Sequence, residues 1–279
     1  MRQILHVSDV HFGPPHRPAV AERVLALALE RRPDLVVISG DLTQRAKPRQ
    51  FRDARAWVDR FEDAGLSTLA VPGNHDVPMY RFWERAGSPF GAYREHFATE
   101  LEPEHHDDEM AVIGVNTARS LTIRDGLIKT SRLKRLATQL AAVPEHKARI
   151  VVAHHHLVPP PRFDTQRVTI NAPEIVDLLA EARVDLVLSG HLHQSFIGST
   201  EAYYPRLRSP VLLVHSGTST SDRGRGCEHG RNTCFWIRIE TDGIELSSLE
   251  VGATSIDELS RHRYPRNRIG SLGPFGAGI

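Results

Sequence analysis

Short apolar runs rich in valine and isoleucine alternate with longer helix-like stretches through the first two-thirds of the chain. Such runs are typical of buried β-strands, and the stretches between them are typical of helices. The pattern predicts strands at 4–8, 35–40, 67–71, 110–116, 149–153 and 184–190, with helices at 18–32, 48–64, 79–97, 131–142 and 172–182. Buried strands flanked by helices predict a layered α/β fold, in which loops at the strand ends carry function.

The last third of the chain has a different pattern. From about residue 194, strand-like segments at 211–217, 234–240 and 243–251 follow one another with no helix-like stretch between them. We expect antiparallel strands that complete a second sheet. The expected fold of residues 1–250 is therefore a four-layer αββα sandwich, with two mixed β-sheets flanked by helices. Residues 251–279 become polar and then rich in proline and glycine, so we expect a surface or mobile tail.

Polar side chains follow five of the predicted strands. Asp9 and His11 come after the first strand, and residues two apart in an extended chain point the same way, so both can reach one point beyond the strand end. Taken alone, an Asp and a His two residues apart are more often simply polar residues of the turn that follows a strand. The other strand ends carry Asp41; Asn74, His75 and Asp76; His154, His155 and His156; and His191 and His193. Because parallel strands end along one edge, we expect these groups to converge on one crevice.

The mixture of these side chains indicates the kind of ion that they would bind. Carboxylate, imidazole and amide oxygen suit manganese, iron, zinc or cobalt better than calcium or an ion that prefers thiolates. So many candidate ligands at one place indicate two metal ions.

The ordered motifs resemble one known family. DVH (9–11), GD (40–41), GNHD (73–76), an apolar strand ending in histidine, and GHLH (190–193) together resemble the calcineurin-like metallophosphoesterases. Each motif is weak alone, but the ordered set is specific and spans about two-thirds of the chain. Phosphoprotein phosphatases of this family carry GDxxDRG, whereas Gln44 stands here in place of the second carboxylate. The closest pattern is that of the bacterial class III cyclic nucleotide phosphodiesterases.

The resemblance implies a role for each matching residue. Asp9, His11 and His193 would hold a first metal ion, and Asn74, His154 and His191 a second, with Asp41 bridging the two. The two divalent ions would be manganese, iron or zinc. A hydroxide between them would attack phosphorus in line. His75, next to a ligand, would be the general acid that protonates the leaving-group oxygen, because imidazole readily transfers protons near neutral pH.

The triple histidine leaves alternatives open. Only one of its three members is expected as a ligand, and His154, the first after the strand, is favoured over His155 and His156. His155 would then contact substrate or solvent. Arg223 and Arg225 lie in a glycine-rich loop where guanidinium and backbone N–H groups could bind a phosphate of the substrate. A plain solvated loop is an equal alternative for these two arginines.

Composition bears on partners and location. With 35 basic and 34 acidic side chains the net charge is +1, so we expect neither a nucleic-acid nor a membrane partner. No apolar run has the length of a transmembrane helix, and two cysteines do not indicate a disulfide framework. These features favour a cytoplasmic protein. An exposed strand of the second sheet could pair across a homodimer.

The function that we expect is hydrolysis of a small phosphodiester, with a cyclic nucleotide as the first candidate substrate. A metal-dependent phosphomonoesterase or nuclease would use the same ligands, although no broad basic groove supports a nuclease. A noncatalytic binding scaffold with a phosphoesterase fold is the alternative of another class. The complete ligand set, together with His75, favours catalysis.

Overall fold

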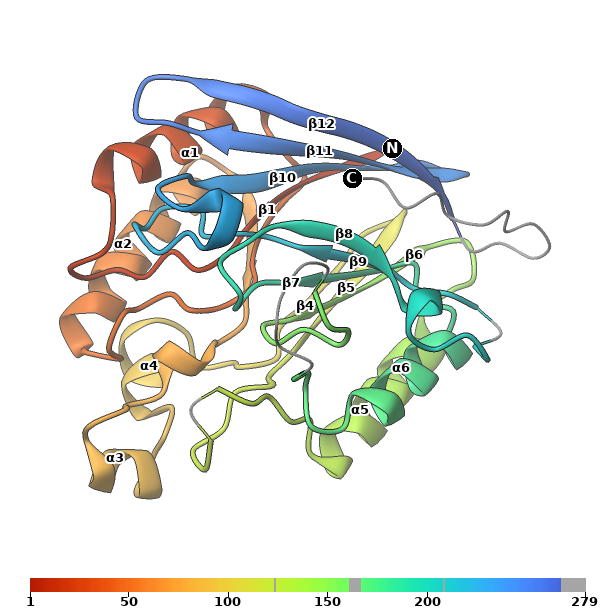
Figure 1. The fold of residues 1–279 in the computed structure, drawn as a ribbon, viewed down its shortest axis with the longest axis horizontal. Helices are drawn as coiled ribbons and strands as arrows, with labels where there is room; N and C mark the ends of the chain where they lie inside the picture. The colour runs from red at the N-terminus through yellow and green to blue at the C-terminus, as the bar shows by residue number, and fades with distance from the viewer. Residues whose placement is uncertain (123, 161–166, 208, 267–279) are drawn as a thin grey trace.

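The computed structural model describes residues 1–122, 124–160, 167–207 and 209–266. Two six-stranded mixed β-sheets pack face to face, and helices cover their outer faces (Figure 1). The strand order is β12-β11-β10-β1-β2-β3 in the first sheet and β4-β5-β6-β7-β9-β8 in the second. This arrangement confirms the predicted four-layer αββα sandwich.

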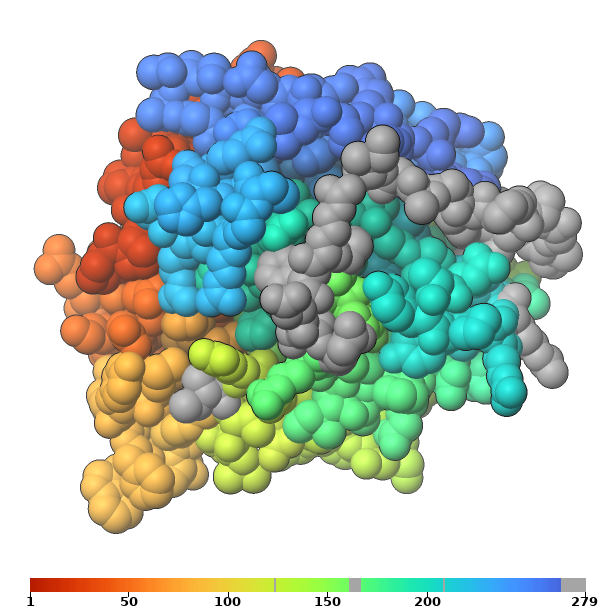
Figure 2. Space-filling model, viewed as in Figure 1, coloured from red at the N-terminus to blue at the C-terminus, as the bar shows by residue number. Residues whose placement is uncertain are grey.

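The first sheet joins the two ends of the described chain. It contains β1 (Arg2–Val7), β2 (Leu35–Ile38), β3 (Ser67–Ala70), β10 (Thr233–Ile239), β11 (Gly243–Val251) and β12 (Ile256–Pro265). The first three strands are parallel, and β10 pairs antiparallel with β1. Helices α1 (Pro18–Arg31), α2 (Pro48–Asp63) and α4 (Gly91–His96) form a common apolar layer with its outer face. The space-filling view accordingly shows the late strands, in blue, beside early residues, in red (Figure 2).

The second sheet carries the middle of the chain. It contains β4 (Glu104–His106), β5 (Met110–Val115), β6 (Ala148–Ala153), β7 (Leu186–Ser189), β8 (Phe196–Ser199) and β9 (Leu212–His215). Strands β5, β6, β7 and β9 are parallel, and the edge strands β4 and β8 are antiparallel to their neighbours. Helices α5 (Thr130–Ala142) and α6 (Ala172–Glu181) cover its outer face. Short 3₁₀ turns occur at Asn74–Asp76, Thr200–Ala202 and Gly226–Glu228.

The central strands are apolar because both of their faces are buried. In β2, Leu35 and Val37 face the second sheet, whereas Val36 and Ile38 pack in the helical layer. Strand β6 repeats this alternation between the two sheets and the α5/α6 layer. Strands covered on both faces are therefore continuous apolar runs, and their ends are the places where polar side chains begin.

Two predicted elements differ in detail from the structure. The single helix expected at 79–97 is instead two short helices, α3 (Phe82–Gly87) and α4, with Pro89 between them. Proline lacks a backbone N–H and disfavours helical geometry in the preceding residue, so it ends the first helix. The strands at 211–217, 234–240 and 243–251 were expected to complete a second sheet as antiparallel strands, and this was wrong. Only β9 joins the second sheet, parallel to β7, whereas β10 and β11 join the first sheet in antiparallel pairs.

Part of the expected tail belongs to a sheet. Residues Ile256–Pro265 form β12, which pairs antiparallel with β11 along its length. The prediction of a tail from residue 251 was wrong for this stretch. An edge strand is held by backbone pairing and tolerates exposed charged side chains, so its polar sequence resembles that of a tail. Residues 267–279 lie outside the described part of the chain. Among the described residues, no helix has the length and apolar character needed to cross a membrane.

Candidate metal centre

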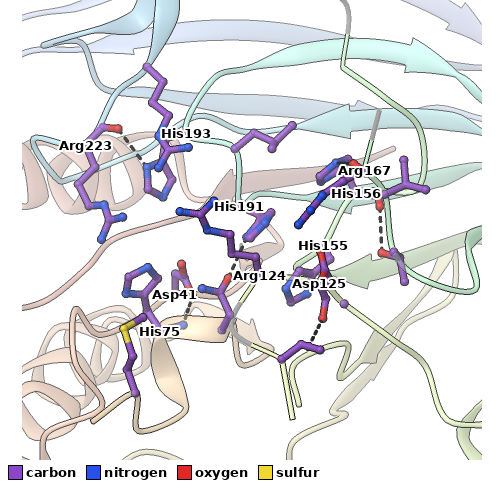
Figure 3. Close-up of a pocket in the computed structure, with 18 of the residues that line it drawn as sticks. Asp41, His75, Arg124, Asp125, His155, His156, Arg167, His191, His193 and Arg223 are labelled. Atoms are coloured by element: carbon purple, nitrogen blue, oxygen red, sulfur yellow. Dashed lines mark hydrogen bonds between the residues drawn. The ribbon is translucent and has the colours of Figure 1, made fainter. Parts of the chain in front are cut away.

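The ends of β1, β2, β3, β6 and β7 lie at one edge of the two packed sheets, where the sequence-predicted side chains meet. Several of them line a pocket of about 1150 Å³, together with arginines from other loops. Figure 3 shows Asp41, His75, His155, His191 and His193 around this pocket. The predicted convergence of these side chains on one crevice is therefore present in the folded chain, and the strands that carry them come from both sheets.

The backbone is sharply turned at these strand ends. Five of the candidate ligands have a positive φ: Asp9 (52°), His11 (51°), Asp41 (51°), His191 (82°) and His193 (58°). This left-handed geometry is unfavourable for residues with a Cβ atom and gathers at functional sites.

Neighbouring glycines allow the loops to approach closely. A Cβ atom on Gly190 would lie 1.8 Å from Ser8 Oγ and 2.4 Å from Asp9 Oδ2. Gly40, with φ +103°, would place a Cβ atom 2.5 Å from His154 Nδ1. The glycines of the GD and GHLH motifs are therefore required for the side chains of the site to fit together.

The first ligand group consists of Asp9, His11 and His193; Asp41 lies beside it, and all four side chains are buried. Nε2 of His193 lies 3.1 Å from Asp9 Oδ1 and 3.1 Å from His11 Nε2. Asp9 Oδ2 accepts hydrogen bonds from Ser8 Oγ and the His191 backbone N–H, whereas its Oδ1 has no hydrogen-bond partner among the described residues. Nδ1–H of His193 donates to the Arg223 carbonyl, at 3.0 Å, which leaves the Nε2 lone pair facing the group. Unpaired carboxylate oxygen and facing imidazole nitrogens are a donor set that fits a divalent cation.

The second ligand group surrounds Asn74. Its Oδ1 lies 3.1 Å from His154 Nε2 and 2.8 Å from His191 Nδ1. Nδ1–H of His154 donates to the Ser39 carbonyl at 2.8 Å, which orients the other ring nitrogen toward the group. Asn74 accordingly joins the two histidines that the resemblance places with it.

Asp41 lies between the two groups. Its Oδ1 is 3.4 Å from His154 Nε2, and its Oδ2 is 3.7 Å from His11 Nε2. The Oδ2 atom is buried and has no hydrogen-bond partner in the described ranges. A carboxylate with one oxygen toward each group is suited to bridge two cations.

The protonation of the site follows from burial and mutual charge. Burial favours neutral carboxyl groups, but the surrounding histidines outweigh it and hold the pKa of Asp9 and of Asp41 well below the ordinary value. Burial lowers the pKa of His11 to about 3. Burial also opposes protonation of His154, yet Asp41 raises its pKa to about 9. The ionised carboxylates and the neutral His11 are in the forms in which side chains bind metal.

The three consecutive histidines have different partners. His154 contacts Asp41 and Asn74, as expected. His155 pairs through Nδ1 with Thr117 Oγ1 at 2.7 Å, and its ring centroid lies 4.6 Å from that of His191. His156 donates through Nε2 to the Arg167 carbonyl at 2.7 Å. Nitrogens of His155, His154 and His191 also lie within 4.8 Å of one another, so His155 borders the second group and the pocket.

His75 lines the pocket beside the first group. Its Nδ1–H donates to the main-chain carbonyl of Gln44 at 3.0 Å, and its ring centroid is 4.9 Å from that of His11. The backbone carbonyl of Gln44 thus orients this imidazole. Arg223 and Arg225 also line the pocket, and Arg223 donates to Gln44 Oε1 at 2.8 Å.

Sequence reasoning assigned no role to some residues of the site. Asp76 is buried and accepts hydrogen bonds from the backbone N–H groups of Leu42, Thr43 and Gly73, so it ties the loop after β2 to the loop after β3. Burial and the nearby Asp41 raise its pKa to about 7. The position of Asp76 in the GNHD motif could have identified it as a residue of the site. Thr117 and Arg124 lie in a loop without a recognisable motif, and no sequence pattern pointed to them.

Comparison with known proteins places this geometry in a family context. Residues 2–195 match the family model described as calcineurin-like phosphoesterase, which confirms the resemblance inferred from the motifs. A protein of Synechococcus sp. named "Probable cyclic nucleotide phosphodiesterase" is 30% identical over 208 residues, covering 70% of this chain and 74% of that protein. A "cAMP/cGMP dual specificity phosphodiesterase" of Mycobacterium tuberculosis is 28% identical over 290 residues, covering 98% and 87% of the two chains.

The fold is also shared with a solved structure. A purple acid phosphatase from yellow lupin superposes with a TM-score of 0.71 at 13% identity. The match covers 94% of this chain and 53% of the lupin chain, so this chain spans about half the length of that protein.

Proposed function

Because the chain belongs to the calcineurin-like phosphoesterase family, we propose that it is a binuclear metal-dependent phosphodiesterase acting on a small phosphodiester, with a cyclic nucleotide as the first candidate substrate. The observation that carries this proposal is the position of Asp41, whose two carboxylate oxygens face two separate ligand groups. The named activities of the two sequence relatives support the choice of a small diester. We further propose that the protein works in the cytoplasm.

In this proposal each ligand group holds one metal ion. Asp9, His11 and His193 would bind the first, Asn74, His154 and His191 the second, and Asp41 both. Manganese, iron and zinc all suit this mixture of carboxylate, amide and imidazole ligands. When bound, two such ions lower the pKa of water and neutralise negative charge on the phosphate.

His75 would act on the leaving group. Its Nδ1–H is engaged by the Gln44 carbonyl, so Nε2 is the nitrogen available to the pocket that the residue lines. From there a proton can pass to the leaving-group oxygen, a contribution of about 10²- to 10⁴-fold in rate. The Asp41 carboxylate accepts the backbone N–H of His75 at 2.8 Å, which ties the position of the acid to that of the bridging ligand.

A comparison of two chromogenic esters tests the reaction class. With Mn²⁺ added, kcat/KM for bis-p-nitrophenyl phosphate is expected to exceed that for p-nitrophenyl phosphate. A faster monoester would contradict the phosphodiesterase proposal and favour a phosphomonoesterase.

Two variants separate catalysis from metal binding. His75→Ala is expected to retain two equivalents of bound manganese and to lower kcat on the diester by about 10²- to 10⁴-fold. Asp41→Asn is expected to lose bound metal together with activity. If the wild type bound no stoichiometric metal and neither variant changed turnover, the noncatalytic scaffold would be the better description.

A further inference from the structure

Among the described residues, five arginines line the pocket, and three of them are linked to residues around His75 and His193. Arg223 bonds to Gln44, which contacts His75 and precedes Arg45 in the chain. Arg225 bonds through its backbone N–H to the His193 carbonyl. Figure 3 shows the Arg223 side chain reaching toward the space between these two histidines. We call Arg45, Arg223 and Arg225 the arginine cluster.

The positive charge of the cluster is not neutralised by an acidic side chain. Within the described ranges, none of the three forms an ion pair, although many arginines elsewhere in the chain do. Arg223 is partly buried, and burial together with Arg225 and Arg45 lowers its pKa, against the opposing effect of Asp41 and Asp9. The chain as a whole has a net charge of only +1, so this excess of positive charge is local.

Neutral groups hold the cluster in place. Arg223 donates to Gln44 Oε1 at 2.8 Å, and the backbone N–H of Arg225 donates to the His193 carbonyl at 3.0 Å. The Arg45 guanidinium lies 5.0 Å from the centroid of the Tyr80 ring. These partners orient the guanidinium groups of Arg223 and Arg45 and fix the backbone of Arg225 without neutralising any charge, which leaves the three residues suited to bind an anion.

The scissile phosphate does not account for this charge. A phosphodiester carries one negative charge, and the proposed metal ions already meet it. Gln44 links the cluster to the proposed general acid. Its backbone carbonyl accepts a hydrogen bond from His75 Nδ1–H, and its side-chain oxygen accepts one from the Arg223 guanidinium. The cluster therefore lies on the side of the pocket where the leaving group would be protonated.

We propose that Arg45, Arg223 and Arg225 form a second anion-binding subsite, which takes a carboxylate or phosphate carried by the leaving group of the diester. This inference rests on the proposed function, since His75 marks the leaving-group side. It changes the first candidate substrate of the proposed function. A simple 3′,5′-cyclic nucleotide has only the scissile charge and would leave the subsite unfilled, so a diester that releases an anionic alcohol is favoured over it.

A matched pair of diesters tests the subsite. Methyl 4-nitrophenyl phosphate and methyl 3-carboxy-4-nitrophenyl phosphate differ by one carboxylate on the leaving group. For each protein, the ratio of kcat/KM for the charged ester to that for the neutral ester is measured with Mn²⁺. The ratio is expected to fall about 10- to 100-fold in Arg223→Gln, the effect of losing a hydrogen bond to a charged group, and to fall in Arg45→Gln. Comparing ratios between proteins cancels the intrinsic difference between the two phenols.

Arg52→Gln is the control for net charge. Arg52 is exposed on α2 and does not line the pocket. The ratio of kcat/KM for the charged ester to that for the neutral ester should therefore be the same in Arg52→Gln as in the wild type. Unchanged ratios in Arg45→Gln, Arg223→Gln and Arg225→Gln would overturn the subsite even if both esters were hydrolysed.

A binding measurement separates the subsite from the proposed reaction. Isothermal titration of the manganese-loaded protein should show tighter binding of 5-hydroxy-2-nitrobenzoate than of 4-nitrophenol, and Arg223→Gln should abolish the preference. If neither ester were turned over, the phosphodiesterase proposal would fail. The difference in affinity between the two phenols would then still test whether the anion-binding subsite exists. No preference in the wild type would refute the subsite.

Discussion

Gly190 lies where the loop after β7 passes the end of β1. A Cβ atom there would overlap Ser8 Oγ and Asp9 Oδ2, two atoms that are hydrogen-bonded to each other at 2.7 Å. Gly190→Ala is therefore expected to displace Asp9, to weaken manganese binding by about 10- to 100-fold, and to lower the free energy of unfolding by about 1–3 kcal/mol. Calorimetric titration and urea unfolding measure the two effects.

Gly87 provides the matched control for this substitution. A Cβ atom on Gly87, at the end of α3, would meet no atom within 4 Å. Gly87→Ala should leave metal affinity unchanged. Equal metal affinity in both alanine variants would show that the close approach at Gly190 has no influence on Asp9.

The two cysteines differ in reactivity. Cys227 is exposed, whereas Cys234 is buried in β10, and burial raises its pKa to about 12. Because the thiolate is the reactive form, a disulfide reagent should label one thiol rapidly in the native protein and both after denaturation. The Cys227→Ser variant should show no rapid labelling, and a fast-reacting thiol in that variant would contradict the burial of Cys234.

Individual ligands were predictable where a motif fixed them, and unpredictable where position alone had to decide. Asp9, His11 and Asp41 follow strands in recognisable motifs and lie in the site. The three consecutive histidines could only be ranked by order along the chain. Their distinction depends on the Ser39 carbonyl, Thr117 Oγ1 and the Arg167 carbonyl, and the first two are remote in sequence.

The segment after β9 holds the turn that presents Asp9 and His11. Hydroxyl groups of Thr218 and Thr220 donate to the carbonyls of Asp9 and Val10, at 2.7 and 3.1 Å. Ser219 Oγ accepts the backbone N–H of Ser8 at 3.0 Å. A run of small hydroxyl residues therefore provides the side-chain hydrogen bonds that an irregular, buried turn needs.

Asn232 in turn fixes this segment. Its Nδ2 donates to the carbonyls of Thr218 and Ser221, and its Oδ1 accepts from Arg17. Asn232→Ala should leave two buried carbonyls without this donor and lower the free energy of unfolding by about 1–3 kcal/mol in urea titrations. Arg17→Ala removes only the third bond, so a loss as large as that of Asn232→Ala would contradict this explanation.

Buried elements were predictable from sequence, whereas three of the four edge strands were not; the edge strand β3 was predicted at 67–71. The central strands and the long helices follow apolar patterns that burial imposes. Strands β4, β8 and β12 lie at sheet edges, where polar side chains meet solvent and the pattern of alternation is weak. The 256–265 stretch, with its charged side chains, was consequently expected to be a tail.

The proposed metal ions would connect the two sheets, because their ligands follow β1, β2 and β3 of one sheet and β6 and β7 of the other. Binding to the native state alone stabilises it by mass action. Removing metal with EDTA should lower Tm, and saturating Mn²⁺ should restore it, by roughly 5–10 °C. Asp41→Asn should show little of this response, and a Tm of the wild type that is insensitive to both treatments would contradict a metal link between the sheets.

A buried ion pair forms a second link between the sheets. Arg266, which follows β12, lies 3.4 Å from Asp185, which precedes β7, and both side chains are less than a tenth exposed. Arg266→Ala leaves the carboxylate without this partner and should lower the free energy of unfolding by about 3–5 kcal/mol. Arg261→Ala, which breaks an exposed pair with Glu258, should cost far less, and similar losses in the two variants would contradict the importance of burial.

The allocation of the late strands to the two sheets could not be predicted. Strands β9, β10 and β11 have similar apolar character, yet β9 pairs with β7 and β10 pairs with β1. Such pairings depend on contacts between residues far apart in the chain, which an apolar pattern does not encode.

The pairing of β1 with β10 also sets the order of events during translation. Once a ribosome has released residue 193, every proposed ligand has emerged. The strand before Asp9 still lacks β10, which begins at Thr233, and the turn still lacks its bonds from Thr218 and Thr220. Binding of the proposed metal ions is therefore expected only at the end of synthesis. A nascent chain that stops before β10 contains all the proposed ligands but lacks the strand and the hydrogen bonds that position them.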